Sequence, residues 1–112
     1  DYLAAVDAPN ISCTHDPLEA AAGAHVLYTD VWVSMGMEEE AARREEAFAG
    51  YQVNAGLLAV ADSNAIVMHC LPAYRGKEIS GEILEDHAET IFSEAENRLH
   101  AQKAILVSLT TA

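Results

Sequence analysis

Two short apolar runs in the chain are predicted to be neighbouring β-strands. The first covers residues 25–29 and the second covers Ala65–Met68, and polar or turn-forming residues bound both. Runs of this length without a polar face are typical of strands buried in a parallel sheet. The first run ends at Asp30, and the second leads directly into His69 and Cys70 before a proline interrupts it. Both predicted strand ends therefore carry polar or reactive side chains.

Helix signals surround these two runs. Pro17 fits the first turn of a helix that Gly23 would end. The charged stretch 37–48 predicts a solvated helix, because it contains glutamate–arginine pairs four residues apart. A further short strand is predicted at Ile11–Thr14. Side chains that can cap a predicted helix are Asp16, Asn54 and Ser80. The alternation of strands and helices indicates an α/β fold with a parallel sheet.

The C-terminal part of the chain predicts a long helix. Thr90–Phe92 is predicted to be extended, and Ser93–Glu96 has the form of a capping box that opens a helix over 94–108. One face of this helix carries Ala95, Leu99, Gln102, Leu106 and Leu109. Because that face is mostly apolar, the helix is expected to pack on another part of the structure.

Composition places the chain among small globular domains. Its 112 residues, 51% of them hydrophobic, suffice for one domain with one core. No apolar run approaches the ~20 residues that a membrane span needs. Because the N-terminal sequence lacks the features of a signal peptide, a cytoplasmic location is expected. The formal net charge of −12 argues against nucleic acid or an anionic membrane as partner. An anionic substrate would need positive charge from elsewhere.

Cys70 is the most reactive side chain of the candidate site. It and Cys13 are expected to be free thiols. Cys70 could be a nucleophile, a metal ligand, a polar contact in a pocket or a buried structural thiol. His69 cannot act as its base, because adjacent side chains of a strand point to opposite faces. A zinc site made from Asp30, His69 and Cys70 is a further alternative, although no characteristic ligand spacing supports it.

Asp30 and Arg98 each allow a structural and a functional interpretation. Asp30 is either a cap or turn residue, or a carboxylate that holds a substrate ammonium group. Gly36 would let the following loop approach a ligand closely. Arg98 either pairs with Glu94 on the helix surface, which the local spacing favours, or binds an anion. Ligands of open α/β sheets bind at the carboxyl ends of the strands, so the loop after Asp30 belongs to the candidate site.

Three segments together resemble the ornithine carbamoyltransferase family. Thr29–Gly36 resembles the ornithine loop of these enzymes, His69–Pro72 resembles their second signature, and Glu96–Lys103 resembles the third. The order and spacing of the segments also fit, and the similarity extends from Ile11 to the C-terminus. The Ser-Met-Gly element within the first segment points to ornithine rather than to aspartate or N-acetylornithine.

The resemblance implies that the δ-amine of L-ornithine attacks carbamoyl phosphate to give L-citrulline and phosphate, as in arginine biosynthesis or the urea cycle. It implies neither a redox cofactor nor a metal. By similarity, Asp30, Ser34 and the Met35 backbone hold the amino-acid groups of ornithine. Cys70 would lie near the reacting amine, and it and Asp30 are the implied catalytic residues.

The resemblance also implies how carbamoyl phosphate is bound. The carbonyl groups of Cys70 and Leu71 would accept hydrogen bonds from the carbamoyl amide, with the Leu71–Pro72 bond in the cis form that is largely confined to proline. Arg98 would stabilise the charge that develops on carbamoyl phosphate. The role of His69 is less defined, since the alternation of side chains turns it away from the ligand.

The sequence lacks other parts of the family pattern. Relatives begin with a carbamoyl phosphate domain, and its Ser-Thr-Arg-Thr-Arg loop and His-Pro-x-Gln element are absent here. Residues 1–112 therefore resemble the C-terminal portion of the ornithine-binding domain, a partial, Rossmann-like parallel sheet. The helix 94–108 would pack on the missing N-terminal domain, and the whole enzyme is expected to be a homotrimer. The alternative is a non-catalytic fragment or remnant that binds an amino acid without turnover.

Overall fold

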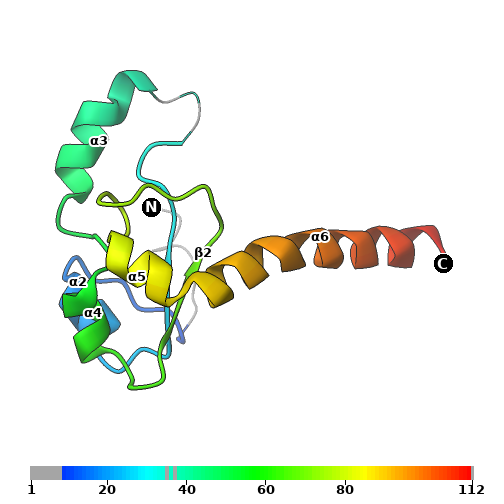
Figure 1. The fold of residues 1–112 in the computed structure, drawn as a ribbon, viewed down its shortest axis with the longest axis horizontal. Helices are drawn as coiled ribbons and strands as arrows, with labels where there is room; N and C mark the ends of the chain where they lie inside the picture. Colours follow the sequence, from blue (N-terminus) through cyan, green and yellow to red (C-terminus); the bar gives the residue numbers. More distant parts are fainter. Residues whose placement is uncertain (1–8, 35, 37, 112) are drawn as a thin grey trace.

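The computed structural model describes residues 9–34, 36 and 38–111 (Figure 1). In this part of the chain, β1 (Val26–Thr29) and β2 (Ile66–His69) form a two-stranded parallel sheet. Val26 pairs with Ile66 at one end, and Thr29 pairs with His69 at the other. The predicted strand pair and its parallel orientation are thus confirmed, and the C-terminal ends of the two strands lie side by side.

Short helices connect and cover the strands. Asp16 caps α2 (Pro17–Ala21), and Asn54 caps α4 (Ala55–Val60), each by accepting two backbone N–H groups. Ser80 caps the remaining predicted helix, α5 (Gly81–Asp86). The charged stretch forms the 3₁₀ turn η1 (Glu38–Glu40) followed by α3 (Ala41–Phe48). These helix starts were visible in the sequence because a side chain that satisfies free N–H groups is a local signal.

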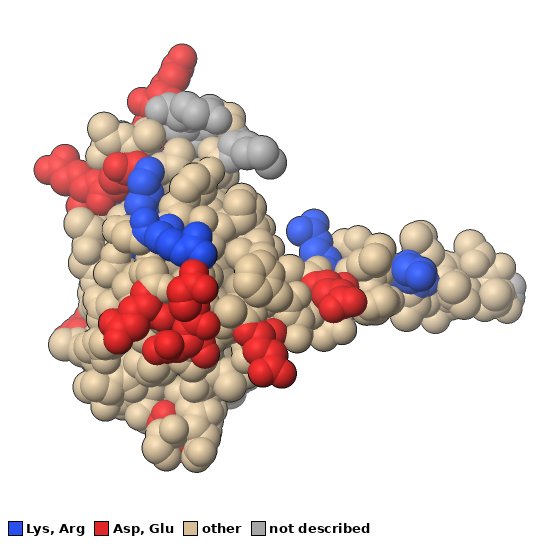
Figure 2. Space-filling view, viewed as in Figure 1, with Lys and Arg blue, Asp and Glu red and all other residues tan. Residues whose placement is uncertain are grey.

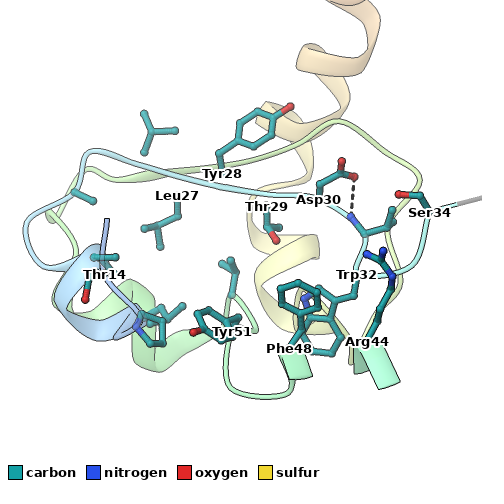
Figure 3. A pocket seen from close by; sticks show the side chains of 18 residues that line it. Thr14, Leu27, Tyr28, Thr29, Asp30, Trp32, Ser34, Arg44, Phe48 and Tyr51 are labelled. Carbon is teal, nitrogen blue, oxygen red and sulfur yellow. Dashed lines mark hydrogen bonds between the residues drawn. The ribbon is translucent and has the colours of Figure 1, made fainter. Parts of the chain in front are cut away.

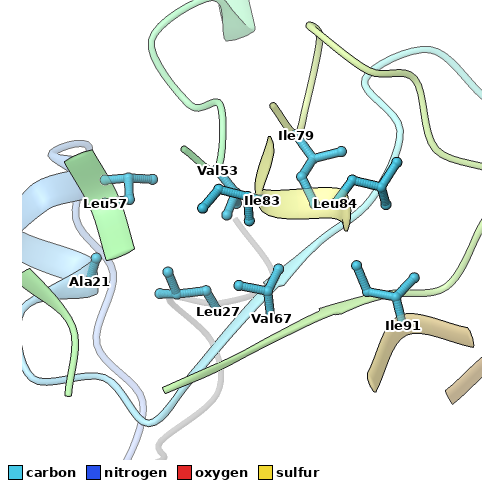
Figure 4. Close-up of a cluster of buried hydrophobic side chains, with 9 residues drawn as sticks. All are labelled: Ala21, Leu27, Val53, Leu57, Val67, Ile79, Ile83, Leu84 and Ile91. Carbon is cyan, nitrogen blue, oxygen red and sulfur yellow. The ribbon is translucent and has the colours of Figure 1, made fainter. Parts of the chain in front are cut away.

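The hydrophobic core lies on one face of the sheet, where α5 and the start of the C-terminal helix α6 (Ala88–Thr110) pack (Figure 4). Leu27 comes from β1, Val67 from β2 and Ile91 from α6, and the last two are fully buried. The complete cluster consists of Ala21, Leu27, Val53, Leu57, Val67, Ile79, Ile83, Leu84 and Ile91. This core fixes the directions in which the two strand ends and the start of α6 project.

Two predicted extended segments are wrong. Thr90–Phe92 lies within α6, which begins at Ala88 rather than at the capping box. The β-branched pair at 90–91 favours a strand locally, but the burial of Ile91 against the core (0% exposed) favours the helix. Ile11–Thr14 forms no strand. Ile11 is 53% exposed, and among the described residues the only strands are β1 and β2, which pair with each other.

Beyond its first turns, α6 projects away from the body of the molecule (Figure 1). Its outer apolar residues are exposed, with Leu99 at 58%, Leu106 at 63% and Leu109 at 74%. In the ranges that the structure covers, no helix combines the length and apolar character needed to cross a bilayer. The predicted apolar face is therefore present, and among the described residues its outer part is exposed, as expected where the packing partner is another domain.

Candidate functional site

The candidate site forms where the two parallel strands end together. Thr29 pairs with His69, so the next residues, Asp30 and Cys70, project beside each other. The Cys70 thiol donates a hydrogen bond to Asp30 Oδ1 with a sulfur–oxygen distance of 3.2 Å. The same oxygen accepts the backbone N–H of Val31 at 2.7 Å (Figure 3). The sequence prediction that these two side chains meet at one sheet edge is confirmed.

The surroundings of Cys70 keep its thiol protonated. Burial raises the pKa of Cys70, and the hydrogen bond to Asp30 and the negative charge of Asp30 raise it further. A thiolate, not a thiol, is the nucleophile in cysteine chemistry and the form that binds metals. The geometry therefore favours a hydrogen-bonding role for Cys70 over the nucleophile alternative. Cys13 is exposed, and both cysteines are free thiols, as predicted.

The His69 side chain lies inside the protein, with one ring nitrogen within 4.8 Å of the Cys70 sulfur. It is fully buried. Its Nδ1 accepts the backbone N–H of Leu71 at 2.9 Å, and its Nε2 lies 3.2 Å from Glu78 Oε1. Because Nδ1 is an acceptor, the proton of the neutral ring lies on Nε2 and is donated to Glu78. Strand alternation predicts that His69 and Cys70 point to opposite faces, yet the His69 ring and the Cys70 sulfur remain close in space.

These bonds also bear on the zinc alternative. One ligand atom each of Asp30, His69 and Cys70 lies within 4.8 Å of the others. Zinc binding would require a free nitrogen lone pair on His69 and a deprotonated thiol. The Nδ1 lone pair is used by Leu71 N–H, and the Cys70 thiol donates its hydrogen to Asp30. The cluster is therefore better suited to hydrogen bonding than to metal binding.

Glu78 is a functional-site neighbour that the sequence did not reveal. It is fully buried, and its Oε1 accepts the backbone N–H of Tyr74 at 2.6 Å as well as the His69 ring. Its other oxygen, Oε2, has no hydrogen-bond partner within the described residues. Val53 holds the main chain here by donating its N–H to the Glu78 carbonyl at 2.8 Å. A carboxylate in a polar loop usually faces solvent, so no sequence pattern signalled its burial.

The loop after Cys70 has an unusual backbone that these side chains hold in place. The Leu71–Pro72 bond is cis, as the family resemblance implied, and Leu71 has a φ of 54°. A non-glycine residue in the left-handed region costs roughly 1–3 kcal/mol. The hydrogen bond from Leu71 N–H to His69 Nδ1 helps to offset this cost. His69 and Glu78 thus support the conformation of the Cys70–Leu71 segment from inside the protein.

On the other side of Cys70, α6 crosses the end of β2. Glu94 Oε2 accepts the backbone N–H of His69 at 2.9 Å. A cavity lies between the strand ends and α6, and its lining includes Tyr28, Cys70, Glu94 and Arg98. The predicted surface pair between Arg98 and Glu94 does not form, and no carboxylate of the described residues lies within ion-pair distance of Arg98. Arg98 therefore faces the site without a competing anion.

Ser34 lies with Asp30 along a second, larger cavity next to the end of β1. Figure 3 shows Ser34 beyond Asp30 on the loop that follows the strand, with Trp32 and Arg44 below it. Trp32 stacks on Phe48 with ring centroids 6.3 Å apart, so it packs the loop onto α3 as a structural contact. Met35, which the resemblance places in the ornithine site, lies outside the described residues.

The charge distribution around the site is strongly acidic. Acidic side chains gather in clusters on the visible face of the body, and basic side chains are fewer (Figure 2). The basic residues of α6 are Arg98 and Lys103. Arg98 lines the cavity beside Cys70, and Arg44, which pairs with Glu40, lines the cavity beside Asp30 and Ser34.

Comparison with known proteins identifies relatives that match nearly the whole chain. Residues 3–109 match the family described as aspartate/ornithine carbamoyltransferase, Asp/Orn binding domain. The chain is 55% identical over 105 residues to the ornithine carbamoyltransferase of Parasynechococcus marenigrum, covering 94% of this chain and 33% of the relative. It is 58% identical over 99 residues to that of Syntrophotalea carbinolica, covering 88% and 33%.

Solved structures agree with the sequence relatives. The anabolic ornithine carbamoyltransferase of Campylobacter jejuni superposes with a TM-score of 0.84 at 47% identity, covering 88% of this chain and 32% of that one. An N-acetyl-L-ornithine transcarbamylase superposes less well, with a TM-score of 0.67 at 33% identity over 86% of this chain and 30% of that one. The chain spans about a third of the length of the curated relatives that it matches. It belongs to the aspartate/ornithine carbamoyltransferase family, through the Asp/Orn-binding domain of those enzymes.

Proposed function

We propose that the chain is part of an ornithine carbamoyltransferase that transfers the carbamoyl group of carbamoyl phosphate to the δ-amine of L-ornithine, giving L-citrulline and phosphate. The observation that supports this most directly is the contact between Asp30 and Cys70 at the joined strand ends, 3.2 Å apart, beside a cavity that Arg98 also lines. The names of the relatives agree with this reaction. Its product is one that arginine biosynthesis consumes.

On the ornithine side, Asp30, Ser34 and the Met35 backbone hold the amino-acid groups. The protonated Cys70 thiol donates its hydrogen to Asp30, so the sulfur lone pairs are left to accept from the δ-amine. Only the neutral amine has the lone pair needed for attack. As the nitrogen bonds to the carbamoyl carbon it loses a proton to the Cys70 sulfur, while the thiol passes its own proton to the Asp30 carboxylate that it already contacts.

On the carbamoyl phosphate side, the carbonyl groups of Cys70 and Leu71 accept hydrogen bonds from the carbamoyl amide and orient its carbon toward the amine. Holding two small reactants in the correct orientation is the largest contribution that such a site can make to lowering the reaction barrier. Arg98 neutralises charge on the phosphate as it leaves. With a formal net charge of −12, this chain cannot supply all the positive charge that a phosphate requires.

We infer that the remaining charge comes from an N-terminal carbamoyl phosphate domain, which would also cover the exposed apolar residues of α6. By the same resemblance, the complete enzyme is a homotrimer. The alternative is a non-catalytic fragment that binds ornithine but does not turn over. The two differ in one observable: whether citrulline forms when the missing domain is restored.

The test is an assay of citrulline formation with the chain alone and with the chain joined to the preceding part of a close relative, which supplies the carbamoyl phosphate domain and the start of the ornithine-binding domain. We expect turnover only in the joined form. Cys70→Ala and Arg98→Ala should each lower it by at least about tenfold, the typical scale for losing one group that acts in the transition state. Cys13→Ala and Lys103→Ala are the matched controls, being the other cysteine and the other basic residue of α6.

Three results would contradict the proposal or part of it. Full activity in Cys70→Ala and Arg98→Ala would remove both residues from the site. Joined protein that binds ornithine but never forms citrulline would favour the non-catalytic alternative. Turnover by the chain alone that is lost in Arg98→Ala would mean that no other domain is needed to hold the phosphate.

A further inference from the structure

Glu94 links α6 to the end of β2. Its Oε2 accepts the backbone N–H of His69 at 2.9 Å, although the two residues lie 25 positions apart. Ile91, one turn earlier on α6, is fully buried in the core, whereas the helix beyond Glu94 projects from the body of the molecule (Figure 1). Later polar contacts, such as the pair between Glu96 and His100, stay within the helix. Together with Ile91, Glu94 therefore sets the direction in which α6 leaves the sheet.

The bond from Glu94 reaches the chain directly before the segment Cys70–Leu71. That segment is also held from inside the protein, because Leu71 donates its N–H to His69 Nδ1 at 2.9 Å. Arg98 lies one helical turn after Glu94 and shares its face of α6. Glu94, Arg98 and Cys70 line one cavity. One carboxylate thus connects the two walls of this cavity, the strand end on one side and the helix on the other.

The energies of the available hydrogen bonds and ion pairs explain why Glu94 bonds to the strand. Its spacing from Arg98 would also allow an ion pair within the helix. An exposed pair of this kind changes an equilibrium by about twofold, whereas a hydrogen bond to a charged acceptor changes it by about tenfold or more. The His69 N–H is therefore the stronger partner, in agreement with the observed bond.

We propose that Glu94 is a positioning residue for carbamoyl phosphate, because it fixes Arg98 relative to the segment Cys70–Leu71. The inference rests on the proposed function, in which Arg98 binds the phosphate and the two carbonyl groups bind the carbamoyl amide of the same molecule. A ligand that contacts both walls loses affinity when the walls can shift against each other. The role requires the acceptor oxygen of Glu94 and not its charge, since a second anion beside a phosphate is unfavourable.

Three substitutions of Glu94 separate the position of the oxygen from the charge. Glu94→Gln keeps an acceptor oxygen at the same reach and removes the charge. Glu94→Asp keeps the charge but withdraws the oxygen by one methylene group, and Glu94→Ala removes both. Glu96→Ala is the matched control, because Glu96 is an exposed glutamate of the same helix that pairs only with His100 among the described residues and does not line the cavity.

The measurement is calorimetric titration of the chain joined to the preceding part of a close relative, first with carbamoyl phosphate and then with inorganic phosphate. Glu94→Ala and Glu94→Asp should raise the Kd of carbamoyl phosphate by about tenfold, the scale of one hydrogen bond to a charged group. The Kd of inorganic phosphate should change by about twofold or less, because phosphate does not contact the carbonyl groups. Glu94→Gln and Glu96→Ala should bind carbamoyl phosphate at least as tightly as the original protein, within about twofold.

A double variant tests whether Glu94 acts through Arg98. In the Arg98→Ala background the helix no longer presents a group that must be aligned, so Glu94→Ala should not weaken carbamoyl phosphate binding by more than about a further twofold. Residues that act as a unit show such non-additive effects. If both substitutions weakened binding independently, Glu94 would stabilise the fold in general and the positioning role would be wrong.

The other outcomes are equally decisive. An unchanged Kd of carbamoyl phosphate in both Glu94→Ala and Glu94→Asp would overturn the proposal, as would equal weakening of carbamoyl phosphate and inorganic phosphate. Weakening in Glu94→Gln to the level of Glu94→Ala would show that the charge is needed, which also contradicts it. The titrations need no turnover. Joined protein that shows the expected binding pattern but forms no citrulline would therefore count against the proposed function alone.

Discussion

The buried contact between Glu78 and His69 offers the sharpest test of how the Cys70 loop is held. Glu78 is fully buried and accepts two hydrogen bonds through Oε1, from Tyr74 N–H at 2.6 Å and from the His69 ring at 3.2 Å. Replacing Glu78 by alanine leaves both donors without an acceptor. Each unsatisfied buried donor costs about 1–3 kcal/mol.

The sum of these costs is about 2–6 kcal/mol, and part of it is offset because the variant no longer buries a carboxylate. We therefore expect Glu78→Ala to lower the free energy of unfolding by about 2–4 kcal/mol, measured by urea denaturation followed by circular dichroism. Glu78→Gln keeps an acceptor oxygen for both donors, so its loss should stay within about 1 kcal/mol. Glu46→Ala, at an exposed glutamate of α3, should change stability by no more than about 0.5 kcal/mol.

The comparison of the three variants separates hydrogen bonding from charge. If Glu78→Ala unfolds within about 0.5 kcal/mol of the original chain, the two donors have found other partners and the buried acceptor is not what holds the loop. If Glu78→Gln is as unstable as Glu78→Ala, the negative charge matters rather than the acceptor oxygen. Either result would refute the account of the loop given above.

Two further predictions follow from burial and from the thiol pKa. Ile91→Ala should lower the free energy of unfolding by about 2–5 kcal/mol. Leu109→Ala, at an exposed position of the same helix, should change it by about 0.5 kcal/mol or less. Equal effects of the two substitutions would contradict the assignment of Ile91 to the core. Because burial and Asp30 raise the pKa of Cys70, its thiolate fraction at mildly alkaline pH is low, and iodoacetamide should modify it more slowly than Cys13. Removing the charge in Asp30→Asn should lower the pKa of Cys70 and speed its modification, and a slower reaction would contradict this sign.

The parts of the fold that the sequence predicted are those with local physical causes. Asp16 and Asn54 accept N–H groups within three residues, so their capping role is encoded nearby. The two apolar runs identified the strands, and their ends identified Asp30 and Cys70 as neighbours. This last inference needed only the rule that parallel strands bring their carboxyl ends to one edge.

The parts that could not be predicted depend on contacts distant in sequence. Glu78 is buried because His69 and the Tyr74 main chain need an acceptor, which no local pattern expresses. The helix α6 already includes Ile91 because the side chain of this residue is buried in the core. Arg98 is unpaired because the His69 main chain binds Glu94, so the favourable spacing of the two residues on the helix misled the prediction.

One face of α6 joins the cavity beside Cys70 to the exposed apolar end of the helix. Residues three to four apart share one face of a helix, so the stripe that begins at Glu94 and Arg98 continues through Ala101 to Ile105 and Leu109. Its first members line the cavity beside Cys70, and its last two are 58% and 74% exposed. A partner surface that covers the apolar end of this stripe lies on the same face of α6 as the cavity. Under the proposed function, one partner surface thus packs on α6 and brings the missing positive charge to the phosphate, and the two requirements are met by a single contact.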